Sequence, residues 1–397
     1  MPRREEKRNL ESIPVGSLRL IPLESCSELG QKVDQYLVRW RTERENEHKN
    51  SLAFSGYQRD SYILNAKISR FGTGEAKGVI NESVRGTDLY ILVDVSNYSL
   101  TYSLCGIQNH MSPDDHYQDL KRIIAAVGGK ARRITVIMPF LYESRQHKKS
   151  ARESLDCAIA LQELVSMGVD NIITFDAHDA RVQNAIPLSG FETVSPTYQF
   201  IKGLLKVEKE LDIDAEHMMV VSPDEGGMSR AIYMANVLGL DMGMFYKRRD
   251  YTRVVDGRNP IVSHEFLGSD VEGKDIIVID DMISSGESIL DVARQLKMRK
   301  AGRIFLCASF GLFTNGFDAF DKAYDEGVFD RILTTNLIYQ SPELLSKPYY
   351  INCDLSKYIA YLIDTLNHDT SISDLLNPND RIQERLASYK AEREGNK

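Results

Sequence analysis

The stretch VIDDMISSGES, residues Val278–Ser288, decides the fold of the half of the chain in which it lies. An apolar run ends in two adjacent carboxylates, Asp280 and Asp281, and a loop of small residues then opens a helical pattern. Polar ligands of open α/β sheets bind at the carboxyl ends of strands, and a helix N-terminus favours a phosphate. The stretch therefore predicts a phosphate-binding strand–loop–helix unit. The alternative is an ordinary turn with serine caps and a solvated acid pair.

Similar apolar runs recur on both sides of this stretch and predict buried strands. Because they are continuous and rich in Val and Ile, they favour parallel sheets that are covered on both faces. Amphipathic segments at 154–165 and 288–297 predict helices between strands, which makes the fold class α/β. The runs are Leu89–Val95, Ile134–Met138, Ile172–Phe175, Met218–Ser222, Ile276–Ile279 and Ile304–Phe310.

Two polar stretches interrupt this alternation. Residues 39–60 predict a surface excursion or helical insertion, and residues 97–118 lack a clear period. The highly charged segment from Asn377 predicts an exposed helix with a frayed end. Gly and Pro near 188–196 favour a domain boundary. The expected division is a first domain at 1–190, a second at 191–345, and a segment at 346–397 that packs back on the first domain before an exposed tail.

Composition excludes several classes of protein. Asp and Glu exceed Lys and Arg by 57 to 49 among 397 residues, so sequence-independent nucleic-acid binding is not expected. The five cysteines form no CxxC pair, which argues against a disulfide framework or a cysteine zinc site. No apolar run reaches the roughly 18 residues of a membrane span, and the N-terminus lacks a signal-peptide core. A cytoplasmic protein without membrane partners is expected.

Three further polar groups follow apolar runs. Asp176 and His178 could hold a divalent ion, although a hydrogen-bonded loop histidine has the same pattern. Asp224, in VVSPDEGG, predicts a tight turn with an exposed carboxylate or a helix cap. The basic runs 144–152 and 247–249 suit phosphate contacts, but charge runs also occur on solvated faces.

Taken in order, these segments resemble the ribose-phosphate diphosphokinase (phosphoribosyl diphosphate synthetase) family from about Leu18 to Leu376. SRFGTGEAKGVINESVRGTDLYIL, at Ser69–Leu92, is similar to the family's F-x-x-G-E and ESVRG elements. MPFLYESRQHKK resembles its catalytic loop and TFDAHDARVQ its histidine motif. VVSPDEGGMSRA, YKRRD and VIDDMISSGES follow in the family order.

The resemblance implies two phosphoribosyltransferase-type α/β domains, each a mostly parallel sheet flanked by helices. It implies transfer of the diphosphoryl group of ATP to the C1 hydroxyl of ribose 5-phosphate with Mg²⁺, giving phosphoribosyl diphosphate and AMP. It also implies a dimer-based homo-oligomer, up to a hexamer, with an adenine pocket shared between neighbouring subunits. The matched positions assign the metal to His178 and Asp224, ATP to Phe71, Glu75, Arg145 and Gln146, ribose 5-phosphate to Asp280, Asp281, Ser284, Ser285, Gly286 and Ser288, and transition-state stabilisation to Lys247 and Arg249.

The chain departs from the family pattern at three positions. His147 replaces the acid of the RQD motif, Ser284 replaces an acidic residue, and Glu287 brings a carboxylate to the phosphate loop. These changes leave two alternatives to an active diphosphokinase. One is a non-catalytic paralogue that regulates an active enzyme, and the other is a phosphoribosyltransferase that consumes phosphoribosyl diphosphate with a base.

Overall fold

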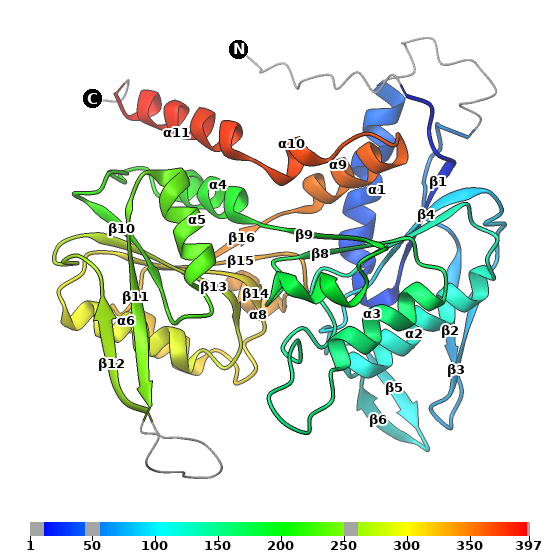
Figure 1. Ribbon diagram of the computed structural model, residues 1–397, viewed down its shortest axis with the longest axis horizontal. Helices are drawn as coiled ribbons and strands as arrows, with labels where there is room; N and C mark the ends of the chain where they lie inside the picture. Colours follow the sequence, from blue (N-terminus) through cyan, green and yellow to red (C-terminus); the bar gives the residue numbers. More distant parts are fainter. Residues whose placement is uncertain (1–11, 44–55, 250–260, 395–397) are drawn as a thin grey trace. The chain divides into compact units, whose positions relative to one another are not determined.

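The predicted strands lie in two separate sheets, which belong to two units of the chain (Figure 1). The computed structural model describes residues 12–43, 56–249 and 261–394. Unit 1 extends to Ser195 and includes 337–339 and 355–377, whereas unit 2 holds 196–336, 340–354 and the residues from Pro378 onward.

Unit 1 contains a five-stranded parallel sheet in the order β1-β4-β7-β8-β9. Three of these strands fall on the apolar runs that the sequence predicted. The strands are β1 (Ser17–Pro22), β4 (Thr87–Leu92), β7 (Arg133–Ile137), β8 (Asn171–Phe175) and β9 (Gly190–Val194). Two antiparallel hairpins stand outside this sheet, β2 (Ala66–Arg70) with β3 (Ala76–Ile80), and β5 (Thr101–Leu104) with β6 (Ile107–His110).

The helices of unit 1 are amphipathic and bury their apolar sides. In α2 (Pro113–Val127), Leu120, Ile123 and Val127 recur at helical spacing and join the core formed with β4 and β7. Ser112 begins this helix through a capping box with Asp115. The other helices are η1 (Glu24–Cys26), α1 (Ser27–Glu43), α3 (Asp156–Ser166), η4 (Ala180–Ala185), α9 (Ser356–Asn367) and α10 (Ser373–Leu376).

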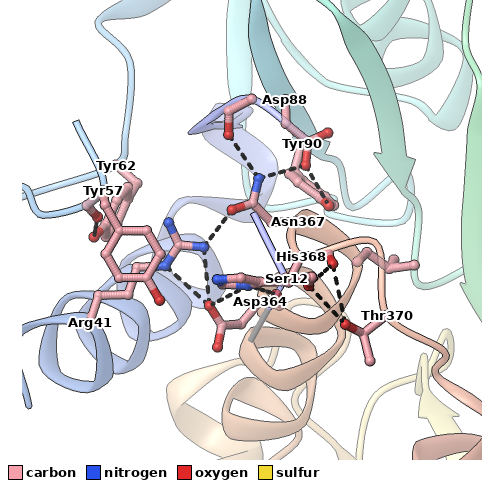
Figure 2. Close-up of polar contacts among 12 residues, drawn as sticks. Ser12, Arg41, Tyr57, Tyr62, Asp88, Tyr90, Asp364, Asn367, His368 and Thr370 are labelled. Atoms are coloured by element: carbon pink, nitrogen blue, oxygen red, sulfur yellow. Dashed lines mark hydrogen bonds and ion pairs between the residues drawn. The ribbon is translucent and has the colours of Figure 1, made fainter. Parts of the chain in front are cut away.

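A buried polar network ties α9 to α1 and to the sheet of unit 1 (Figure 2). The guanidinium of Arg41 donates to Asp364 Oδ1 at 3.1 Å and to Asn367 Oδ1 at 2.7 Å. Asn367 Nδ2 in turn donates to Asp88 Oδ2 on β4 at 2.8 Å. Residues 323 positions apart in the chain are therefore paired, which fixes the late helix α9 on the N-terminal unit.

The prediction of a surface excursion or helical insertion at 39–60 is wrong for the first residues of this stretch. Residues Arg39–Glu43 form the last turn of α1, in which Trp40 and Arg41 are buried. Tyr57 and Tyr62, which follow, are buried as well. The middle of the stretch, 44–55, lies outside the described residues. These buried side chains make both ends of the stretch part of the unit 1 interior.

Unit 2 contains a seven-stranded sheet in the order β12-β11-β10-β13-β14-β15-β16. All neighbours are parallel except β12, which pairs antiparallel with β11 at one edge. Strands β10, β13 and β14 confirm the strands that were predicted from the apolar runs in this part of the chain. The strands are β10 (Met218–Ser222), β11 (Asp241–Arg249), β12 (Ile261–Leu267), β13 (Asp275–Ile283), β14 (Ile304–Gly311), β15 (Arg331–Thr335) and β16 (Tyr350–Cys353).

Helices cover both faces of this sheet. Helices α6 (Glu287–Met298) and α7 (Asp318–Asp325) share one core with the strands, and α4 (Thr197–Val207), α5 (Met228–Leu238) and α11 (Asn379–Glu394) share the other. The short α8 (Pro342–Ser346) begins at Ser341, whose hydroxyl accepts the Leu344 N–H. The observed arrangement is an α/β fold with a mostly parallel sheet.

The charged segment from Asn377 is not an exposed tail as expected. Ile382, Leu386 and Tyr389 of α11 are buried in unit 2, and the Tyr389 hydroxyl accepts the Leu211 N–H at 2.9 Å. Their spacing of four and three residues gives a narrow apolar stripe along the helix. Because many charged residues lie between them, this stripe is hard to recognise in the sequence. In the part of the chain that the structure describes, no helix has both the length and the apolar character needed to cross a membrane.

Candidate active site

Three of the predicted carboxylates lie at one edge of the unit 2 sheet. Asp224 follows β10, while Asp280 and Asp281 lie near the end of β13. Because β10 and β13 are parallel neighbours, their carboxyl ends meet at the same edge. The sheet therefore gathers acidic groups that are more than 50 residues apart in the sequence.

The carboxylates of β13 interact strongly. Asp281 is buried, with one Arg230 nitrogen 3.9 Å from its carboxylate, and its N–H donates to Asp280 Oδ1 at 2.8 Å. Burial raises the pKa of Asp280 to about 8, and the charges of Asp281 and Asp224 contribute to the shift. This edge of the sheet therefore favours a proton or a cation beside Asp280.

Asp224 lies in the turn between β10 and α5, as the sequence predicted. Its Oδ1 accepts the N–H groups of Gly226 at 2.8 Å and Gly227 at 3.3 Å. The Ser222 hydroxyl donates to the Asp224 carbonyl at 2.6 Å and tightens the turn. A Cβ at Gly227 would lie 2.8 Å from that hydroxyl, so the close turn requires glycine. The carboxylate is thus held in place by its own turn.

The strand, loop and helix predicted at Val278–Ser288 are present, and the loop between β13 and α6 is the candidate phosphate cradle. Gly286 has φ of 88° and is the N-cap of α6, and the Ser285 hydroxyl accepts the Glu287 N–H at 3.5 Å. A Cβ at this position would lie 2.1 Å from Phe320 Cζ. The first turn of a helix carries unsatisfied N–H groups and partial positive charge, both of which suit an anion.

The hydroxyls of the cradle surround this helix start. Ser284 and Ser285 are half-buried in the loop, and Ser288 is exposed in the first turn of α6. The Ser284 carbonyl accepts the Thr314 N–H at 3.0 Å, which anchors the loop to the segment after β14. Glu287, the departure noted in the sequence, is exposed as the first residue of α6.

Lys247 and Arg249 lie on β11, the strand next to the edge strand β12 of the unit 2 sheet. Their backbones are in register with His264 and Ile261 of β12. The register of this pair shifts between Arg248 and Arg249. The basic run noted in the sequence thus forms the end of a strand.

His178 lies in unit 1, just past the end of β8. Its ring centroid is 5.4 Å from that of His147, the residue that replaces the family acid. His147 Nε2 is 3.5 Å from Asp179 Oδ2, and the Arg181 side chain holds the pKa of Asp179 well below its usual range by hydrogen bonding. Asp176 has φ of 41°, a left-handed conformation that is uncommon outside glycine.

Arg145 and Gln146 belong to the polar loop after β7. Arg145 is exposed, whereas Gln146 Nε2 donates to the Ser154 carbonyl at 2.8 Å. The Gln146 N–H donates to the Glu143 carbonyl in a turn in which Glu143 has φ of 54°. The loop thus presents Arg145 to solvent and ties Gln146 to the start of α3.

Phe71 and Glu75 lie at the tip of the β2–β3 hairpin. The Phe71 N–H donates to the Glu75 carbonyl at 2.7 Å, and the Gly74 N–H donates to the Phe71 carbonyl at 2.9 Å. Phe71 is 51% exposed, unusual for a large apolar side chain at a hairpin tip. The predicted nucleotide contacts are thus held together by one tight turn.

Some residues near these sites were not found from the sequence. Arg230 near Asp281, Phe320 under Gly286 and Asp179 beside His147 come from separate elements, so only tertiary contact reveals them. Among the described residues, no group of three or more His, Cys, Asp or Glu side chains is arranged as a complete metal site.

Comparison with known proteins identifies the family. Residues 18–168 match the model of the N-terminal domain of ribose phosphate pyrophosphokinase, and residues 196–347 match the phosphoribosyl transferase domain model. A solved phosphoribosylpyrophosphate synthetase from Mycobacterium smegmatis superposes with a TM-score of 0.69 at 22% identity, over 89% of this chain and 99% of that chain. This similarity supports the two-domain phosphoribosyltransferase-type fold.

Curated relatives agree with the domain models. The ribose-phosphate pyrophosphokinase of Vibrio parahaemolyticus is 31% identical over 316 residues, which cover 79% of this chain and 91% of that protein. The Pasteurella multocida protein of the same name is 32% identical over 312 residues, covering 78% and 90%. The chain therefore belongs to the ribose-phosphate pyrophosphokinase family.

Proposed function

We propose that the chain transfers the diphosphoryl group of ATP to the C1 hydroxyl of ribose 5-phosphate, giving 5-phosphoribosyl 1-diphosphate and AMP. The observation that carries this proposal is the carboxyl edge of the unit 2 sheet. There the Asp280–Asp281 pair is followed by a loop that ends at Gly286, the N-cap of α6. A sugar phosphate needs groups that accept hydrogen bonds from its hydroxyls and, close to them, a site for its phosphate. Here the carboxylates and the helix N-terminus are only a few residues apart in the chain.

The two parts of ribose 5-phosphate have different requirements, and the residues of β13 and its loop meet both. The first-turn N–H groups of α6, with Ser284, Ser285, Gly286 and Ser288, would bind the 5-phosphate. Asp280 and Asp281 would accept hydrogen bonds from the two ribose hydroxyls. Glu287 is exposed as the first residue of α6, and the proposal requires its carboxylate to point away from the 5-phosphate.

The residues at this edge also fit Mg²⁺. Magnesium prefers oxygen ligands and is usually held by one or two carboxylates together with substrate phosphates. Burial raises the pKa of Asp280, and the charges of Asp281 and Asp224 add to the shift, so a divalent cation beside these carboxylates would be favoured. Asp224 and, in unit 1, His178 are the proposed metal-linked residues. When bound, the ion would neutralise the phosphate charge that develops during transfer.

The remaining predicted residues would position ATP and stabilise the transferred group. Arg145 and Gln146 would contact the phosphates, and Phe71 and Glu75 the adenine. In the transfer, the C1 oxygen bonds to the β-phosphorus while the bond from that phosphorus to the oxygen bridging the α-phosphate breaks. AMP departs with that oxygen, and the C1 hydroxyl proton is released. Lys247 and Arg249 would offset the negative charge on the transferred oxygens.

The proposal also includes assembly into a homo-oligomer. Phe71 is about half exposed on a hairpin tip. In the assembly, it would contact the adenine of ATP that is bound to a neighbouring copy of the chain. A dimer would then be the smallest complete unit, and larger rings would be built from it.

The test is to measure AMP and phosphoribosyl diphosphate formed by the purified chain with ATP, Mg²⁺ and ribose 5-phosphate. Lys247→Ala is expected to abolish most of the turnover, whereas Lys322→Ala, whose side chain is 75% exposed on α7, should leave it unchanged. Wild-type protein that binds both substrates without turnover would favour a regulatory paralogue. Product formation only from phosphoribosyl diphosphate and a base would favour a phosphoribosyltransferase.

A further inference from the structure

The segment at 97–118, which has no clear sequence period, contains a second hairpin that contacts the proposed nucleotide loop. Strands β5 and β6 pair from Thr101–His110 at the open end to Leu104–Ile107 at the closed end. Cys105 and Gly106 form the turn, with φ of 49° and 82°. Two residues with positive φ suit the twist of a short hairpin. The segment is therefore a defined ribbon.

This hairpin packs against the loop Phe71–Glu75 at the tip of β2–β3. The Cys105 N–H donates to the Gly72 carbonyl at 2.8 Å. A Cβ built on Gly74 would lie 2.8 Å from Leu104 Cδ1 and 3.8 Å from a Tyr102 ring carbon. Leu104 and Tyr102 therefore lie directly against the backbone of the loop, which only glycine permits at that distance.

An arginine links the two hairpins to helix α2. The guanidinium carbon of Arg70 is 4.5 Å from the centroid of the Tyr102 ring, and Arg70 Nη1 donates to the Gly74 carbonyl at 3.3 Å. Arg70 Nη2 also donates to Asp119 of α2 at 2.6 Å. The Tyr102 ring thus packs on the Arg70 guanidinium, which itself donates a hydrogen bond to the loop at Gly74. The contact between the two hairpins therefore has both an apolar and a polar part.

We propose that the β5–β6 hairpin is a positioning element that holds Phe71–Glu75 ready for the base of the nucleotide, and that it thereby sets the affinity for ATP. The inference rests on the proposed function, because it assumes that this loop contacts the adenine. Tyr102, Leu104 and the Cys105 N–H carry the contact.

The physical reason is preorganisation. The base of β2–β3 packs on the unit 1 core through Ala66, Ile68 and Ile80, but its tip contains two glycines, whose backbones are costly to order. If a loop becomes ordered only when the ligand binds, the entropy cost of ordering it is subtracted from the binding free energy, and the affinity is lower. The β5–β6 hairpin orders the loop before ATP binds. Its removal should therefore lower the affinity for ATP and leave the affinity for ribose 5-phosphate unchanged.

The test removes the hairpin from the full chain with little disturbance. The Met111 N–H already donates to the Leu100 carbonyl at 2.9 Å, so residues 101–110 can be replaced by an Asn-Gly turn. Leu104→Ala is the point variant. Gln108→Ala is its matched control, because Gln108 is exposed and pairs with Ser103 on the opposite face of the ribbon.

The measurements are kcat and the KM values for ATP and ribose 5-phosphate, with fluorescence-monitored thermal melting to verify folding. The replacement is expected to raise the KM for ATP about tenfold, and Leu104→Ala severalfold, while the KM for ribose 5-phosphate stays within about twofold. Gln108→Ala should match the wild type. An unchanged KM for ATP in both folded variants, or an equal rise in both KM values, overturns the proposal.

Calorimetric titration with ATP separates this inference from the proposed function. If the wild-type chain forms no AMP but its ATP affinity falls on removal of the hairpin, the proposed reaction fails and the positioning role stands. If the wild-type chain is active and its ATP affinity does not depend on the hairpin, the reaction stands and the positioning role fails. A wild-type chain that binds no ATP overturns both.

Discussion

Replacing Arg41 by alanine should destabilise unit 1 more than any surface charge change. Arg41 and Asp364 have side chains that are only 1% and 2% exposed, and the arginine fork makes two hydrogen bonds of 3.1 Å to one carboxylate oxygen. The guanidinium carbon also lies 4.4 Å from the centroid of the Tyr57 ring. Arg41→Ala would leave the Asp364 carboxylate buried without its cation.

The magnitude follows from that buried charge. Removing one partner of a buried ion pair costs about 3–5 kcal/mol, mainly because the other charge is left in a region of low polarity. Arg39 provides the matched control, since it lies two residues earlier on α1 and its side chain is 62% exposed in a pair with Glu43. Arg39→Ala should cost less than about 1 kcal/mol.

The assay is urea unfolding followed by the fluorescence of Trp40, the single tryptophan of the chain. Trp40 is adjacent to Arg41 and stacks on Tyr361 of α9 with ring centroids 4.3 Å apart, so it reports on the contact between α1 and α9. The double variant Arg41→Met with Asp364→Leu should recover most of the loss, because both charges are then absent. A loss below about 1 kcal/mol for Arg41→Ala would refute the reasoning.

Three further outcomes concern the unit 2 loop. Gly286→Ala should lower stability by about 3 kcal/mol and raise the KM for ribose 5-phosphate, as seen by melting and kinetics, because the new methyl would overlap Phe320 at a positive φ. Glu287→Gly should leave the KM for ribose 5-phosphate unchanged, since Glu287 is exposed; a clear decrease would mean that its carboxylate faces the phosphate. Asp280→Asn, studied with a chelator and no substrate, should raise the melting temperature at pH 8 and have little effect at pH 4. The pKa of Asp280 is raised to about 8 by burial and by Asp281, so the folded state binds the extra proton and loses stability as the pH rises from about 4 to 8. An equal effect at both pH values would contradict that explanation.

Much of the unit architecture was predictable from local sequence. The runs that became β4, β7, β8, β10, β13 and β14 are short, continuous and apolar, which is the pattern of strands buried on both faces. The strand–loop–helix at Asp280–Glu287 was predictable too, because its apolar strand, its turn of small residues and its helix are consecutive in sequence. Local chemistry suffices where the chain makes a site from neighbours in sequence.

Other features could not be predicted because they depend on contacts between distant segments. The pairing of Arg41 with Asp364 spans 323 positions, and neither residue has a sequence pattern that marks it as buried. The burial of Tyr389 in α11 depends on Leu211, far away in the chain. A charged side chain is expected at the surface unless a partner is known, and the sequence does not name the partner.

The β5–β6 hairpin shows the same division between local and tertiary information. The Cys105–Gly106 dipeptide permits a tight turn, and that much is local chemistry. Only the folded chain sets Leu104 against Gly74 and Tyr102 over Arg70. The sequence alone determined the family motifs, the strand runs and the strand–loop–helix that follows Asp280, because periodicity and turn chemistry act over a few residues. The tertiary structure decided which distant side chains share an interior, because burial depends on what packs against each residue.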